Sequence, residues 1–136
     1  MLWEKILVFE GSYMIYGVGI DLVRVERMKE VMERWGQRFL EKVFTAGEIS
    51  YCYKKRNPYL SFSVRFAAKE ALIKALGSAV PFSLKEIEVV NVDSGKPLLK
   101  VDGRVEIFFK EKLIKKVHLS LSHEHEYGVA CVVLEQ

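Results

Sequence analysis

A carboxylate and an ammonium group lie one helical turn apart in the stretch RFAAKEALIKALG, which spans residues 65–77. Alanine, leucine, lysine and glutamate favour a helix, so Glu70 and Lys74 are predicted to share one helix face. Two interpretations of the pair stay open. It is a surface ion pair worth roughly a few tenths of a kcal/mol, or Glu70 holds a metal ion while Lys74 faces a phosphate. The second interpretation requires another carboxylate.

Asp21 is the candidate for that second carboxylate. It directly follows residues 15–20, whose β-branched and apolar side chains predict a buried strand that ends at Asp21. A carboxylate buried alone is costly, so Asp21 is either a cap at the strand end or a metal ligand. Gly17 and Gly19 in this strand indicate a close backbone approach or a bulge. Two carboxylates are hard-oxygen ligands that suit Mg²⁺, which keeps several waters and takes substrate phosphates as further ligands.

A run of cations, Lys54-Lys55-Arg56, precedes Asn57-Pro58 and predicts a basic loop. The loop is either a solubilising surface feature or a grip on phosphate groups. Together with the two carboxylates and Lys74, it favours a phosphoryl-transfer site, in which positioning and charge stabilisation provide most of the catalysis.

Three histidines, His118, His123 and His125, allow two other kinds of site. A zinc site would need a third ligand at fixed geometry, and the sequence has neither paired cysteines nor an HExxH helix. A serine hydrolase could use Ser120 or Ser122 with His123, but the GxSxG nucleophile elbow is absent. Both kinds of site are less favoured than the two-carboxylate site.

Apolar residues at helical spacing predict an amphipathic helix over residues 23–35. Arg24, Arg27 and Arg34 give this helix a basic surface. That surface is either simply solvated or a docking face for an acidic helix, with Met28 as an adaptable apolar contact.

The other elements follow from local signals along the chain. Thr45 and Glu48 form a capping box that opens a helix through about residue 53. The central helix is predicted over residues 61–76 and ends at Gly77. The remaining predictions are a helical turn at 39–44, strands at 87–90, 98–101, 117–123 and 127–134, and a helix at 105–113.

The bulk composition bounds the class of protein. A chain of 136 residues, half of them hydrophobic, suits one compact domain at residues 14–136, after an N-terminal extension, 1–13, to which no role is assigned. No apolar run of about 18 residues occurs, so no membrane-spanning helix is expected. Without a signal peptide or a cysteine motif, we expect a cytoplasmic protein with free thiols at Cys52 and Cys131. The net charge of +3 permits an acidic partner and does not by itself indicate nucleic acid.

Four motifs in fixed order resemble those of the 4′-phosphopantetheinyl transferases, and in particular their small bacterial type, the holo-acyl-carrier-protein synthases. The motifs are Gly19-Ile20-Asp21, residues 65–77, the turn Asp93-Ser94-Gly95-Lys96-Pro97 and the strand Leu119-Ser120-Leu121-Ser122-His123. The resemblance runs from about residue 14 to residue 135. One departure is Gly77-Ser78-Ala79, where many relatives carry Gly-Thr-Gly.

The resemblance implies an α+β fold, in which a mixed, largely antiparallel sheet packs against a long central helix. It implies an enzyme of fatty acid biosynthesis that moves 4′-phosphopantetheine from coenzyme A to a serine of apo-acyl carrier protein and releases adenosine 3′,5′-bisphosphate. It also implies a homotrimer with active sites between subunits. No nucleic-acid or membrane partner is expected. The alternative function is a non-catalytic oligomeric module that binds acidic proteins or nucleotides through its basic faces.

The resemblance also assigns site residues position by position. Asp21 and Glu70 match the magnesium ligands, and Lys74 matches a lysine that faces the pyrophosphate. The implied nucleotide contacts are Lys55, Arg56, Lys74 and His123. The implied contacts to acyl carrier protein are Arg24, Arg27, Met28 and Arg34.

Overall fold

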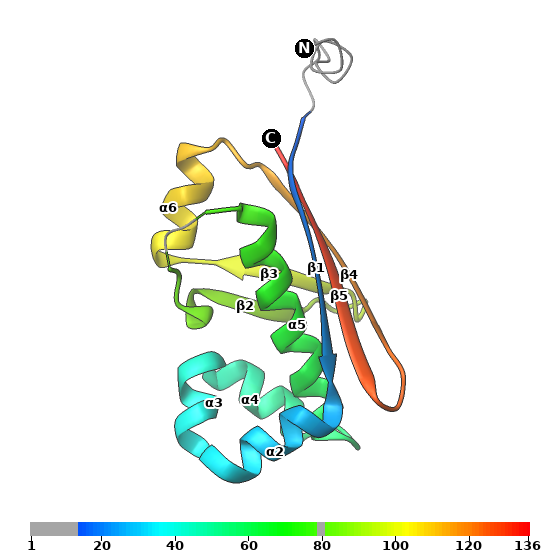
Figure 1. The fold of residues 1–136 in the computed structure, drawn as a ribbon. Helices are drawn as coiled ribbons and strands as arrows, with labels where there is room; N and C mark the ends of the chain where they lie inside the picture. Colours follow the sequence, from blue (N-terminus) through cyan, green and yellow to red (C-terminus); the bar gives the residue numbers. More distant parts are fainter. Residues whose placement is uncertain (1–13, 79–80) are drawn as a thin grey trace, which may run out of the picture.

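Helices and strands are mixed along the chain, and a long helix crosses the sheet at the centre of the molecule (Figure 1). The computed structural model describes residues 14–78 and 81–136; the predicted extension at 1–13 and residue 79 of the loop after the central helix lie outside the described residues. In order, the elements are β1 (Ile15–Arg24), α2 (Val25–Trp35), α3 (Gln37–Val43), α4 (Ala46–Tyr53), α5 (Pro58–Leu76), the 3₁₀ turn η1 (Leu84–Glu86), β2 (Ile87–Asn91), β3 (Pro97–Val101), α6 (Gly103–Glu111), β4 (Lys116–His123) and β5 (Tyr127–Glu135). The predicted α+β class is confirmed.

The main sheet has three strands in the order β1-β5-β4, and each neighbouring pair is antiparallel. Its register places Asp21 opposite Ala130 and Leu22 opposite Val129. Strands β2 and β3 form a separate antiparallel hairpin. The helix α5 covers one face of the main sheet, while α2, α3 and α4 gather around the first half of α5 (Figure 1). Among the described residues, no helix combines the length and the apolar character needed to cross a bilayer.

Two glycines of β1 let α5 approach the sheet at backbone distance. A Cβ atom on Gly19 would collide with the carbonyl oxygen of Ala71, and one on Gly17 would collide with that of Ala75. The predicted close backbone approach is therefore confirmed, and the register of β1 also shifts once near its start. Because Ala71 directly follows Glu70, the same backbone contact fixes Glu70 above β1.

A buried ion pair ties four further elements to α5. Lys69 of α5 and Glu48 of α4 are both buried, and Lys69 Nζ lies 2.5 Å from Glu48 Oε1. Lys69 also donates to the carbonyl oxygens of Val43 (2.7 Å) and Leu84 (3.1 Å). Glu48 Oε2 in turn accepts from the backbone N–H of Val89 at 2.9 Å. A buried ammonium needs such a set of acceptors, so the pair holds α3, α4, η1 and β2 against α5.

The ends of three elements test the local signals. The capping box predicted at Thr45 is confirmed at the start of α4. The predicted start of the central helix at residue 61 is wrong: α5 begins at Pro58, because Asn57 caps it and proline fits a first turn that needs no N–H donor. The predicted end of the first strand at Asp21 is also wrong. Strand β1 runs on to Arg24, because β5 supplies a pairing partner for each residue of this stretch.

Candidate active site

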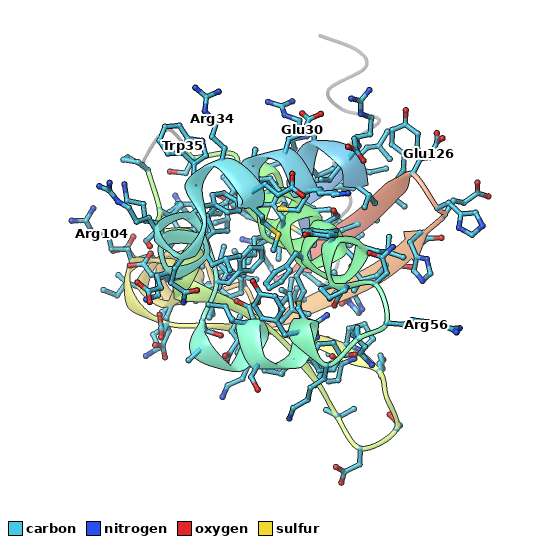
Figure 2. The ribbon with its side chains drawn as sticks, turned by 90° about the horizontal axis from the view of Figure 1, so that it is seen from below. Glu30, Arg34, Trp35, Arg56, Arg104 and Glu126 are labelled. Atoms are coloured by element: carbon cyan, nitrogen blue, oxygen red, sulfur yellow. The ribbon has the colours of Figure 1, made fainter. Side chains whose placement is uncertain are left out.

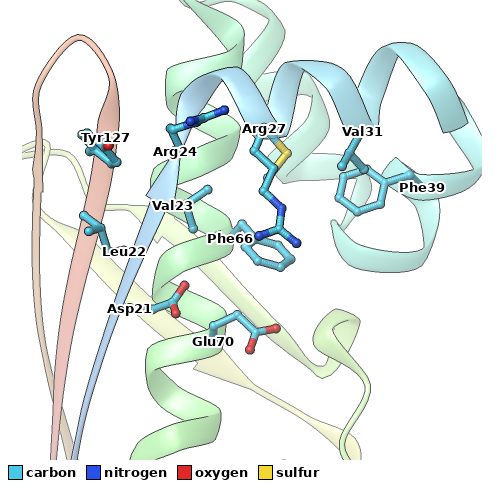
Figure 3. Close-up of a pocket in the computed structure, with 11 residues that line it drawn as sticks. Asp21, Leu22, Val23, Arg24, Arg27, Val31, Phe39, Phe66, Glu70 and Tyr127 are labelled. Atoms are coloured by element: carbon cyan, nitrogen blue, oxygen red, sulfur yellow. The ribbon is translucent and has the colours of Figure 1, made fainter.

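Asp21 and Glu70, the predicted metal ligands, are brought together by the packing of β1 against α5. Their carboxylates lie side by side at a cavity of about 510 Å³ (Figure 3). Burial raises the pKa of the Glu70 carboxyl above its usual value, the neighbouring Asp21 carboxylate raises it further, and Lys74 acts in the opposite direction. Burial and a second carboxylate both disfavour the ionised form of such a group, and a bound cation would stabilise that ionised form.

Lys74 contacts this acid pair through Asp21. Its ammonium donates to Asp21 Oδ1 at 2.9 Å and to the carbonyl oxygen of Ile20 at 2.9 Å. The Lys74 side chain is 54% exposed, whereas that of Asp21 is 16% exposed. Of the two interpretations left open for Glu70 and Lys74, the simple surface pair along one helix is not the contact found here: Lys74 of α5 pairs with Asp21 of β1. An exposed ammonium beside two acids can also meet a phosphate that enters from solvent.

The donor set fits magnesium better than zinc. Within residues 14–78 and 81–136, no cluster of three or more His, Cys, Asp or Glu side chains could hold a metal ion. Magnesium accepts two hard oxygens, because waters and phosphate oxygens complete its shell. The histidine alternative gains no support, since His118 Nε2 faces Glu135 Oε2 at 2.8 Å while His123 lines a different cavity.

The helix predicted to dock a partner forms one wall of the carboxylate cavity. Arg24 and Arg27 line it, and Figure 3 shows Arg27 reaching from α2 toward the two carboxylates. Met28 lines it as well but is only 3% exposed, so little of this predicted partner contact is at the surface. Arg34 stands near the far end of α2, with its guanidinium carbon 5.2 Å from the ring centre of Trp35; both side chains project outward (Figure 2).

Three of the four predicted nucleotide-binding residues meet in a second cavity of about 400 Å³, while the fourth, Lys74, lies beside Asp21 instead. Lys55 and Arg56 come from the loop between α4 and α5, and His123 comes from the end of β4. Arg56 extends into solvent (Figure 2). Neither Asp21 nor Glu70 lines this second cavity, so one chain keeps its acid pair and its basic group in separate cavities.

Arg65 also lines the basic cavity and was not predicted as a site residue. It is 5% exposed, and its guanidinium carbon lies 3.8 Å from the ring centre of Tyr51. Its Nη2 donates to Asn91 Oδ1 at 2.6 Å, while Nε is buried without a hydrogen-bond partner among the described residues. The signal available in the sequence was the position of Arg65 at the start of the motif that carries Glu70.

Comparison with known families decides what kind of protein carries these two cavities. The family model described as the 4′-phosphopantetheinyl transferase superfamily matches residues 17–132. The chain belongs to this superfamily. The match includes Asp21 of β1, Glu70 of α5 and His123 at the end of β4.

Members of the superfamily resemble this chain over most of its length. A holo-[acyl-carrier-protein] synthase from Halothermothrix orenii is 45% identical over 124 residues, which are 90% of this chain and 99% of the relative. The crystal structure of the holo-[acyl-carrier-protein] synthase from Neisseria meningitidis gives a TM-score of 0.84 at 32% identity and covers 90% of this chain and 100% of that one. A Bacillus anthracis synthase in complex with CoA (3′,5′-ADP) gives 0.74 at 35% identity, over 90% and 98% of the two chains.

This member of the superfamily also exposes an apolar sheet face. On the side of β1 that faces away from α5, Val18, Ile20 and Leu22 are 60%, 61% and 62% exposed. Their register partners on β5 are also apolar: Val133, Cys131 and Val129. We call these six residues the outer sheet face. A contiguous exposed apolar surface of this kind is typical of a protein interface.

Proposed function

We propose that the protein transfers 4′-phosphopantetheine from coenzyme A to a serine hydroxyl of apo-acyl carrier protein and releases adenosine 3′,5′-bisphosphate, with magnesium as cofactor. The observation that carries this proposal is the acid pair of Asp21 and Glu70 beside Lys74, on motifs that match the superfamily. The name of the Halothermothrix orenii relative and the CoA complex of the Bacillus anthracis synthase support the same reaction.

Asp21 and Glu70 would hold the magnesium ion. The fit rests on two hard-oxygen donors from different elements and on the raised pKa of Glu70, which burial and the Asp21 carboxylate produce. When bound, the ion supplies positive charge that offsets the charge of the coenzyme A diphosphate.

Lys74 would stabilise the departing phosphate. In the transfer, a bond forms between the serine oxygen and the phosphorus of the phosphopantetheine arm, while the bond from that phosphorus to the bridging oxygen breaks. The bridging oxygen leaves on adenosine 3′,5′-bisphosphate with extra negative charge, which the half-exposed ammonium of Lys74 is placed to meet. The serine proton goes to a carboxylate of the acid pair; comparing the pH–rate profiles of Glu70→Gln and Asp21→Asn identifies which one.

The basic cavity would hold the nucleotide end of coenzyme A. Lys55, Arg56 and His123 supply polar and cationic groups from two elements, and Arg65 adds a buried guanidinium. Phosphate groups are suitable ligands for this set of cations, because lysine and arginine form charge-assisted hydrogen bonds with phosphate oxygens.

The basic face of α2 would dock the carrier protein, through Arg24, Arg27 and Arg34 at the surface and Met28 within the cavity. Charge reversal in Arg24→Glu with Arg27→Glu should weaken carrier binding and flatten its salt dependence. Arg104→Glu with Lys110→Glu on α6 is the matched control, since this pair changes the net charge by the same amount away from α2 (Figure 2). A salt response that is unchanged by the double substitution contradicts the docking face.

A homotrimer would complete the active site. The outer sheet face offers an apolar surface for a second copy, and Leu22 borders both the carboxylate cavity and a shallow pocket that His123 lines. Packing on this face would bring the basic cavity of one copy toward the acid pair of the next. Ile20→Lys places a charge on this face, so sedimentation equilibrium should change from trimer to monomer and transfer should be lost. A monomeric wild-type protein with full activity contradicts the trimer.

The decisive experiment mixes the protein with coenzyme A, magnesium and an apo-carrier protein and measures the carrier by mass spectrometry. A mass gain of one phosphopantetheine group is expected with wild type and none with Asp21→Ala. Circular dichroism of Asp21→Ala should match wild type, because the change removes a ligand and not core volume. No gain with any carrier tested would favour the non-catalytic binding module instead.

A further inference from the structure

Arg65 is an unusual cation because its burial is not matched by a carboxylate. It is 5% exposed, and no carboxylate in the described part of the chain forms an ion pair with it. A buried guanidinium without an anion is costly, so this arrangement is stabilised when an anion enters the cavity that Arg65 lines. The buried Nε finds no acceptor within residues 14–78 and 81–136, so one donor of this guanidinium has no partner in that part of the chain.

Asn91 at the end of β2 determines how this guanidinium is held. Its Oδ1 accepts from Arg65 Nη2 at 2.6 Å, and its Nδ2 donates to the carbonyl oxygen of Gly95 at 2.9 Å. One amide therefore links the guanidinium to the turn between β2 and β3. The ring of Tyr51 supports the guanidinium from one side, so two contacts from different elements fix its plane.

We infer that Asn91 is a positioning residue for the nucleotide: its neutral amide holds the Arg65 guanidinium in the basic cavity while leaving its positive charge available to a phosphate. The inference rests on the proposed function. A carboxylate at this position would accept the same hydrogen bond but would also neutralise Arg65. The chemistry thus explains why an amide serves here, since it orients the cation without competing with the substrate.

Two substitutions separate orientation from charge. Asn91→Ala removes both hydrogen bonds, while Asn91→Asp keeps an acceptor for Arg65, loses the donor to Gly95 and adds a negative charge. Val92→Asp is the matched control, because it adds the same charge at the adjacent position, whose side chain is 40% exposed. Binding of adenosine 3′,5′-bisphosphate is measured by isothermal titration calorimetry, and KM for coenzyme A and kcat are measured in the carrier assay.

The dissociation constant should rise about fivefold in Asn91→Ala, which only loses the orientation of Arg65. It should rise about twentyfold or more in Asn91→Asp, because the new carboxylate also neutralises Arg65 and so weakens its charge-assisted hydrogen bonds to phosphate. KM should follow the same order while kcat stays within about threefold, since Asn91 does not reach the reacting atoms. Val92→Asp should bind within about twofold of wild type, and its melting temperature should stay within about 2 °C of wild type because Val92 is exposed.

Three results would overturn the assignment: both Asn91 variants within twofold of wild type, equal losses in the two variants, or an equal loss in Val92→Asp. Equal losses in Ala and Asp would assign the effect to the turn and not to Arg65. Failure of the proposed function is distinguishable, because wild type itself would then neither bind adenosine 3′,5′-bisphosphate nor modify the carrier.

Discussion

The contact between Gly19 and Ala71 links the packing of the fold to the geometry of the acid pair. A Cβ atom added to Gly19 would lie 1.8 Å from the carbonyl oxygen of Ala71, and real Cβ atoms essentially never come closer than 3.0 Å to another heavy atom. Gly19→Ala must therefore separate β1 and α5 by more than about 1 Å. Overpacking of this kind costs about 2 kcal/mol or more. For a chain of this size, the melting temperature should fall by roughly 6–10 °C.

The same separation should weaken catalysis beyond the loss of stability. Gly19 lies two residues before Asp21, and Ala71 directly follows Glu70, so the added methyl group moves the two carboxylates apart. A misplacement of about 1 Å in a reacting site costs about 100-fold in rate, and kcat/KM for carrier modification should fall by that order well below the melting temperature.

The matched control is Gly47→Ala in α4. A Cβ atom at Gly47 meets a flexible carboxylate, Glu88 Oε2, at 3.3 Å and no backbone, so both stability and kcat/KM should stay near wild type. Differential scanning fluorimetry and the mass assay measure the two effects. Gly19→Ala with a melting temperature within 2 °C of wild type and kcat/KM within threefold would refute the close-packing argument.

Three further predictions concern stability. Lys69→Met strands the buried carboxylate of Glu48 and should lower the free energy of unfolding by about 3–5 kcal/mol in urea titrations; a loss below about 1 kcal/mol would contradict the role of this pair. Glu70→Gln, measured with chelator, should be more stable than wild type at pH 7, and the gain should vanish below the ordinary pKa of 4.5. Because the pKa of Glu70 is higher in the folded than in the unfolded state, wild type loses stability as pH rises from 4.5 through the folded-state pKa. A stability gain in Glu70→Gln that does not change with pH would contradict this raised pKa. Leu113→Gly should raise the unfolding free energy by about 0.5–1 kcal/mol, because Leu113 has φ 57° and is 66% exposed. Leu98→Gly in β3 should lower it instead.

Local patterns in the sequence predicted most elements, because they depend on residues close along the chain. The capping box at Thr45 and the long central helix are such cases. The wrong boundaries of β1 and α5 have different causes. The length of a strand depends on its partner strand, and β5 extended β1 past Asp21. The start of α5 was missed because Asn57-Pro58 was assigned to the end of the basic loop, although proline is well suited to a first helical turn.

The sequence by itself determined the residue types of the site: two acids, a lysine beside them and a separate group of cations, on motifs that match one superfamily. Only the tertiary structure decided which of these groups meet. The glycine contact between β1 and α5 brings Asp21 beside Glu70 and pairs Lys74 with Asp21. The fold also places the acid pair and the basic group in separate cavities of one chain. The physical reason is that propensity acts over one or two turns of chain, whereas a meeting of distant side chains depends on how closely whole elements can pack.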